Sequence, residues 1–516
     1  MKNQIKKIVP LLLVLYTQQA HTQDLYGKTF FSPRSQGSDS ARRLIGQHPY
    51  MHKTEGEKCY GTISATAQYS RSFKTRRVAE YFFGTDTINF SGSQVPNRDA
   101  EDILADYFGL SPEFQGSLTL NPQIRMFVMD FGFYCGLDNL YPGLYIRSAF
   151  PAVWTRHFIC LEETTQNDGS SAQFPALYMD TAALTAPAQS IKKYFEGNLT
   201  YGHVQEGITF GKIGCVEKRG LADFWFALGW NFIREERGHF GINIQAAGPT
   251  GSTPNGTYMF EPVVGNGDHW ELGFGFTGAL LLWEKDGDQT VTLNVDANFT
   301  HLFKSRQCRT FDFCENGFGS RFILLKEFDS TKAYTGTCIP AINKTTLACD
   351  VWASMKIDAA ILASYKNRHW TFDFGYNGWI RTREKINLCG SITENSFGFK
   401  GIQDVDGAGA NNTQSSATLY GNTLDVATQA STMDASPVFI KTTDLDLSSA
   451  ASPLAITHKF FTHLTYVWDY EKYQRAIPYF GLGFSVEFEG IRHNYASPNK
   501  NTLSLFALVA KGGLVF

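Results

Sequence analysis

Hydrophobic and polar residues alternate along much of the second half of this 516-residue chain. In the stretch 475–489, Phe480 and Leu482 fall on one face, while Ser485 and Glu487 fall on the other. This period of two is typical of a β-strand whose two faces meet different surroundings. On this basis strands are predicted at 222–232, 239–246, 269–283, 290–303, 352–366, 369–381, 459–470, 475–489 and 502–516.

The connections between these strands alternate between short and long. Short turns are expected at 235–238, 285–288, 367–368 and 471–474, and long loops at 247–268, 304–351, 382–458 and 490–501. In an up-and-down barrel all turns at one rim share one side of the membrane, so this alternation is typical of long extracellular loops and short periplasmic turns. The strands are also longer than those usual in soluble proteins. The predicted fold is therefore all-β, an up-and-down antiparallel transmembrane β-barrel.

The first half of the chain contributes further strands to this barrel. Candidates lie at 60–73, 117–134, 144–161 and 203–217, with one more expected near 172–180. Because a closed bacterial barrel of this type needs an even number of strands, we expect about fourteen, with twelve or sixteen as alternatives. Short helices are expected at 97–109 and 186–195.

The turn positions predict which residues face each other on neighbouring strands. A tight turn at 367–368 would place Asp358 opposite Asn377, both on the inward face. The next short turn would similarly place Lys459 opposite Glu487.

The stretch Asn501 to Phe516 alternates as the last predicted strand, with Lys511 on its inward face. It resembles the C-terminal strand of bacterial outer-membrane β-barrels, which ends on an aromatic residue. The resemblance implies a location in the outer membrane of a Gram-negative bacterium and recognition by the barrel-assembly machinery. The residues that would form this assembly signal are Phe506, Leu508, Leu514 and Phe516.

The beginning of the chain has the layout of a secretory signal peptide. Three lysines precede a short apolar run, 8–16, which is followed by the small residue Ala20. No other apolar run is long enough for a transmembrane helix. The expected organisation is a signal peptide at 1–23, an N-terminal periplasmic or plug segment at 24–56, and the barrel at 57–516 with its long surface loops 304–351 and 382–458.

Composition narrows the function further. The formal charge of −3 argues against binding nucleic acid, which requires a basic surface. Nine cysteines in an exported chain favour disulfides. Two disulfides are predicted among Cys308, Cys314, Cys338 and Cys349 in the loop 304–351. No CxxC pair or histidine at finger spacing accompanies them, so neither a metal site nor another cofactor is expected.

No catalytic residue can be assigned. The enzymes known among outer-membrane barrels are proteases with paired Asp and His-Asp groups and phospholipases with a Ser-His-Asn set, and no local motif matches either. His463 and Asp469 share one inward face, yet six residues along a strand cover roughly 20 Å, too far for a base and its orienting partner. The chain is therefore expected not to be an enzyme.

The inward faces of the strands carry the remaining chemistry, with more acidic than basic residues. In a water-filled pore this excess would favour cations. The alternative is a lumen whose charges pair with one another structurally while the loops set selectivity. The residues expected to line the pore are Asp296, Lys356, Asp358, Asp373, Asn377, Arg381, Glu487 and Lys511.

In its architecture the chain resembles general porins, which implies passive diffusion of small hydrophilic solutes or ions. A preference for cations would follow from the acidic inward faces only if the lumen is open and hydrated. Two alternatives stay open. One is a ligand-specific transporter of the fatty-acid-transporter type, with an apolar pocket and an N-terminal hatch. The other is a surface adhesin or structural barrel. The expected partners are outer-membrane lipid, the barrel-assembly machinery and small solutes or ions; a homo-oligomer is left open.

Overall fold

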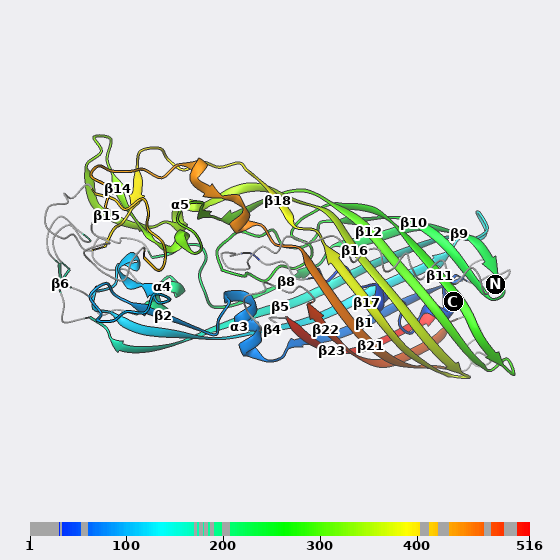
Figure 1. Cartoon of the computed structure of the whole chain (residues 1–516). Coiled ribbons are helices and arrows are strands. Elements are labelled where there is room, and N and C mark those ends of the chain that lie inside the picture. Colours follow the sequence, from blue (N-terminus) through cyan, green and yellow to red (C-terminus); the bar gives the residue numbers. More distant parts are fainter. Residues whose placement is uncertain are drawn as a thin grey trace, which may run out of the picture.

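The computed structural model describes residues 30, 34–52, 60–169, 173–174, 179, 184–185, 190–198, 207–402, 412–421, 433–468, 476–489 and 503–516. Within them, twelve antiparallel strands close into a barrel, because β1 pairs with both β4 and β23, and β4 also pairs with β5 (Figure 1). The predicted β-barrel is confirmed, with the smallest of the three expected strand counts. In order around the barrel, the strands are β1 (Tyr60–Ser72), β4 (Gln115–Gly136), β5 (Leu144–Asn167), β9 (Phe224–Glu235), β10 (Gly238–Gly248), β11 (Glu271–Lys285), β12 (Gln289–Thr310), β16 (Thr346–Asn367), β17 (Trp370–Arg381), β21 (Ala455–Val467), β22 (Ile477–Glu489) and β23 (Ser504–Val515).

The two further strands of the fourteen-strand expectation do not enter the ring. Of the stretch 203–217, the described residues 207–217 contribute only to β8 (Cys215–Leu221). This strand pairs with the extracellular part of β5, beyond the part that pairs with β9. Of the stretch 172–180, β6 (Gln173–Phe174) forms a small separate sheet with β7 (Leu184–Thr185), and most of the remainder lies outside the described residues.

The outer surface of the barrel is apolar, as alternation requires for a wall with lipid on one side. Among the described residues, no helix is both long and apolar enough to cross a membrane. The strands place the protein in an outer membrane, with side chains that face lipid from every part of the wall. Examples are Phe131, Phe226, Trp230, Ile244, Phe274, Phe374, Phe460, Leu482, Leu508 and Leu514, all of them exposed.

Four strands, β4, β5, β12 and β16, continue far beyond the others on the side opposite the short turns. The strand β5 has 24 residues, whereas β23 has 12. Their extensions support a folded extracellular cap with its own apolar core, at the left of Figure 1. The cap and its junction with the barrel contain α3 (Thr75–Phe83), α4 (Ile191–Glu196), α5 (Ile342–Thr345), β2 (Thr87–Ser91), β3 (Ile103–Leu104), β13 (Asp312–Phe313), β14 (Leu324–Phe328), β15 (Tyr334–Pro340), β18 (Glu384–Leu388), β19 (Phe397–Phe399), β20 (Leu445–Asp446), η3 (Ala105–Phe108), η4 (Ser320–Phe322), η5 (Thr442–Asp444) and η6 (Leu447–Ala450).

The register between β16 and β17 differs from the prediction by two residues. The two strands are joined by a two-residue turn at 368–369, with Arg368 at a φ of 51°, so the turn begins one residue later than expected. Asn377 therefore lies opposite Ala360 and not opposite Asp358. Because side chains alternate with a period of two, the slip leaves every residue on its predicted face.

The predicted disulfides are wrong, since Cys308, Cys314, Cys338 and Cys349 are all free thiols. The stretch 304–351 is not a plain loop, because β12 extends to its start and β16 begins before its end. Cys349 lies opposite inward-facing Gln307, and Cys308 lies opposite Ala348, so these two thiols point to opposite sides of the wall.

The helices expected at 97–109 and 186–195 are shorter than predicted. Only η3 forms in the first stretch, directly after β3. In the second, the described residues begin at Ser190, which caps α4, and this helix ends at Glu196. The longer helix α3 was not predicted.

Candidate functional site in the barrel lumen

A short stretch near the N-terminus, residues 34–52, lies inside the barrel; we call it the luminal segment. It contains α2 (Ser40–Leu44) and η2 (His48–Tyr50). The Asp39 side chain caps α2 by accepting a hydrogen bond from the backbone N–H of Arg42 at 3.1 Å. Because a helix of five residues is not stable alone in water, its contacts with the barrel must hold it in place.

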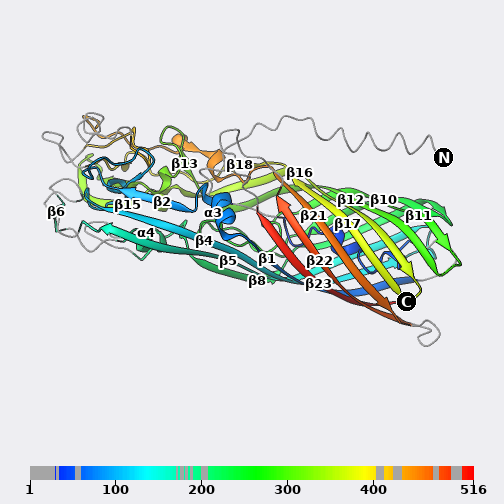
Figure 2. The ribbon, with the colours of Figure 1, turned by 60° about the horizontal axis from the view of Figure 1, so that its bottom comes forward.

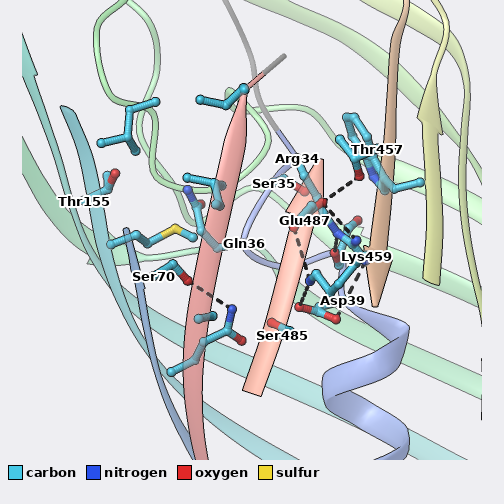
Figure 3. A pocket seen from close by; sticks show the side chains of 18 of the residues that line it. Arg34, Ser35, Gln36, Asp39, Ser70, Thr155, Thr457, Lys459, Ser485 and Glu487 are labelled. Carbon is cyan, nitrogen blue, oxygen red and sulfur yellow. Dashed lines mark hydrogen bonds and ion pairs between the residues drawn. The ribbon is translucent and has the colours of Figure 1, made fainter. Parts of the chain in front are cut away.

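A cluster of five charged side chains fixes the start of the luminal segment to the wall. Figure 3 shows Arg34, Asp39, Lys459 and Glu487 of this cluster. The guanidinium of Arg34 is 2.8 Å from Asp358 and 3.3 Å from Glu487. The Lys459 ammonium is 2.7 Å from Asp39 and 3.5 Å from Glu487. The predicted cross-strand pair of Lys459 and Glu487 is thus confirmed.

Asp358 of β16 is the centre of this cluster. Besides Arg34, it accepts hydrogen bonds from the backbone N–H of Ser40 at 2.9 Å, the Ser40 hydroxyl at 3.0 Å and the Asn377 amide at 2.8 Å. The carboxylate therefore binds both the segment and the neighbouring strand, and a buried carboxylate needs such partners.

A second carboxylate, Asp373 of β17, holds the end of the segment. It accepts hydrogen bonds from the backbone N–H of Gly46 at 3.1 Å and the Ser364 hydroxyl at 2.7 Å, and it lies 3.2 Å from the His48 ring. A third attachment comes from Arg42, which is 2.7 Å from Asp130 of β4 and whose carbonyl accepts from Lys511.

The remaining predicted pore residues pair with other parts of the wall. The pairs are Asp296 with Arg147 at 2.5 Å, Lys356 with Glu271 at 2.5 Å, and Arg381 with Glu384 at 3.3 Å. All eight predicted residues lie on the inward face, and Asp296, Asp373 and Asn377 are 0% exposed. Each one is hydrogen-bonded or ion-paired, so these side chains hold the luminal segment and the wall together.

A cavity of about 70 Å³ lies between the luminal segment and the walls formed by β1, β4, β22 and β23 (Figure 3). Ile124, Met126, Leu503 and Leu505 line its apolar side. Its polar side contains Gln36 and charged side chains, namely Arg34, Asp39, Arg42, Lys459, Glu487 and Glu489. For comparison, an apolar cavity that holds benzene measures about 150 Å³, so a ligand of that size could enter only if neighbouring groups moved.

Periodicity along the strands does not reveal the residues that fix the luminal segment to the wall, namely Arg34, Asp39 and Arg42. The usable signal was charge, since Arg34, Arg42 and Arg43 fall within ten residues of a chain whose predicted inward faces carry an acidic excess. The described residues contain no group of three or more His, Cys, Asp or Glu side chains suited to a metal ion.

Comparison with known proteins identifies no family, since no family model and no curated protein matches the chain. Among solved structures, the chain is similar to an outer-membrane channel from Pseudomonas putida, with 10% identity, a TM-score of 0.33, and coverage of 90% of this chain and 98% of that one. A FadL homologue from Pseudomonas aeruginosa matches with 8% identity, a TM-score of 0.27, and coverage of 94% and 99%. The toluene transporter TbuX from Ralstonia pickettii matches with 10% identity, a TM-score of 0.27, and coverage of 94% and 98%. Similarity at this level transfers neither substrate nor mechanism to this chain.

Proposed function

We propose that this protein is a ligand-specific outer-membrane transporter for small, mainly apolar molecules, whose passage is controlled by the luminal segment. The observation that carries the proposal is a lumen filled by this segment, with an apolar-lined cavity beside it. A general porin needs an open, hydrated lumen, and the buried, paired state of Asp358 and Asp373 does not support one.

The lining of the cavity supports an apolar ligand class. Ile124, Met126, Leu503 and Leu505 offer a surface without charges, and burying apolar area against it is favourable. Polar groups such as Gln36 at the opposite side could orient one polar end of a ligand. Because the cavity is smaller than a benzene site, transport requires the luminal segment to move, which makes it the controlling element.

A planar-bilayer experiment separates this transporter from a porin. The purified wild-type protein is expected to show no steady nanosiemens steps, because the luminal segment fills the lumen. Deletion of residues 34–52 is expected to produce such steps, since the inward faces are polar. The electrophoretic shift on heating verifies that both proteins are folded barrels. Steady porin-like steps from the wild-type protein would contradict the proposal.

Ligand binding is tested with the fluorescent apolar probe N-phenyl-1-naphthylamine. Replacing Leu505 by glutamine places an unpaired amide in the cavity wall and should weaken binding about tenfold, as expected for a polar group costing about 1–3 kcal/mol. Leu508→Gln is the matched control, because Leu508 lies on the same strand but is exposed on the lipid side. Equal binding by wild type and Leu505→Gln would reject this cavity as the site and favour the surface-structural alternative.

A further inference from the structure

Three arginines form a row on the outer surface of the barrel. Arg71 of β1 lies directly opposite Arg125 of β4, which in turn lies directly opposite Arg156 of β5. The three strands lie side by side (Figure 2), and the three residues occupy outward positions of the alternating pattern. With about 4.8 Å between neighbouring strands, the row is roughly 10 Å long at the backbone.

Ion pairs among the described residues do not explain the row. The guanidinium of Arg125 donates to Gln123 at 2.6 Å, and that of Arg156 donates to the Cys215 thiol at 2.9 Å. Within the described part of the chain, none of the three arginines takes part in an ion pair. Like charges directly opposite on neighbouring strands destabilise a sheet, so this arrangement favours an external anion.

The carboxylate of Glu217 lies next to one end of the row and is shared among several partners. Glu217 of β8 lies opposite Arg156, yet one of its oxygens accepts from the Trp154 indole at 3.3 Å and the other lies 3.1 Å from Arg219. Glu217 therefore offsets the charge of Arg156 only in part, and among the described residues no carboxylate forms an ion pair with Arg71 or Arg125.

The row lies at the level of lipid headgroups. From Tyr60 to Arg71, β1 covers roughly 36 Å along its axis, or roughly 28 Å across the membrane at the usual tilt, which is close to the height of a lipid-facing band. A matching row of aromatic residues lies two residues closer to the periplasm on each strand, as in the aromatic girdle at a membrane interface. These residues are Tyr69, Phe127 and Trp154, again directly opposite one another.

We propose that this arginine row binds the phosphate groups of the phosphorylated glycolipid that forms the outer leaflet of the membrane. Guanidinium groups bind phosphate oxygens in a bidentate manner, which is stronger and more directional than binding by lysine. Because the row is longer than a single phosphate, a headgroup with two phosphates can engage both of its ends. The apolar wall below the row, which includes Phe131, is then in position to contact the acyl chains.

The test uses the full purified chain in detergent and bisphosphorylated lipid A as the probe, with binding followed by native mass spectrometry. The triple variant Arg71→Gln, Arg125→Gln, Arg156→Gln is expected to bind about tenfold or more weakly. Arg306→Gln is the matched control: Arg306 is also an outward arginine with a 64% exposed side chain, but Asp350 already neutralises it at 2.6 Å. This control should bind as the wild type does.

Two further measurements keep the proposal falsifiable even if the triple variant does not fold. Wild-type protein should bind dephosphorylated lipid A about tenfold more weakly than the bisphosphorylated form, and phosphatidylglycerol should not displace lipid A at equal concentration. Equal binding of the two lipid A forms, or unchanged binding by a folded triple variant, would overturn the proposal. Displacement by phosphatidylglycerol would overturn the glycolipid assignment. None of these outcomes affects the proposed transport function.

Discussion

Replacing Leu482 by arginine is expected to lower the free energy of unfolding of the barrel by about 2–4 kcal/mol, the cost of a cation at the lipid-facing midplane of such a wall. Leu482 is 60% exposed on the outer face and lies near the middle of β22, opposite Ala510 of β23. The arginine would have to leave water for hydrocarbon, or distort the bilayer to stay hydrated.

Leu282→Arg is the matched control, because the free-energy cost of a lipid-facing arginine depends on its depth in the membrane. Leu282 is similarly exposed, at 55%, but it lies close to the periplasmic turn after β11. There the expected loss is only about 0–1 kcal/mol. Both values are measured by denaturant unfolding of the protein folded into lipid vesicles. Equal losses at the two positions would contradict the assigned depth of the lipid band.

The two faces of the barrel could be predicted from sequence because burial along a strand changes with every residue. Asp358 and Lys511 were correctly assigned to the inside, and Leu508 and Leu514 to the outside. Even the two-residue error in register between β16 and β17 preserved these faces. Local alternation thus determines which side a residue faces, but it does not determine which residue lies opposite.

The extracellular cap could not be predicted in the same way. Its core joins segments that are distant in sequence, as in the ring contacts of Phe108 with Tyr194 at 5.2 Å and of Phe195 with Phe322 at 5.3 Å. Contacts of this kind leave no periodic signal. The cap also needs long strands to support it. For this reason β12 and β16 continue into the stretch 304–351, which was expected to be a loop.

Whether the lumen is open or filled depends on ion pairs between residues that are even further apart in the sequence. Arg34 and Asp358 are 324 residues apart, and Asp39 and Lys459 are 420 residues apart. A pattern on one strand identifies an inward carboxylate, but it cannot reveal whether water or a buried arginine meets it. The charge balance between the N-terminal arginines and the inward acids is the signal in the sequence that could have indicated a filled lumen, and the predictions made from the sequence did not use it.

Replacing Asp358 by alanine is expected to release the luminal segment while the barrel stays closed. The change removes the carboxylate that accepts two of the three hydrogen bonds from Ser40 to Asp358, and it leaves the buried Arg34 with weaker compensation. Breaking a buried ion pair from one side costs about 3–5 kcal/mol, which would raise the released population by about a hundredfold or more. The backbone pairing of β16 with β17 does not involve this side chain. The lost free energy should therefore weaken the binding of the luminal segment to the wall and leave the barrel itself stable.

Limited trypsin digestion measures this release, because Arg34, Arg42 and Arg43 are cleavage sites that the barrel wall protects in the wild type. Cleavage within the segment should accelerate strongly in Asp358→Ala, and channel steps should appear in planar bilayers. Asp288→Ala is the matched control, since Asp288 also pairs with an arginine, Arg368, but both side chains are more than half exposed. An exposed pair contributes little, so this variant should digest as the wild type does. If Asp358→Ala folds and remains as resistant and as silent as the wild type, the carboxylate does not hold the segment, and control of passage must be sought in the extracellular cap.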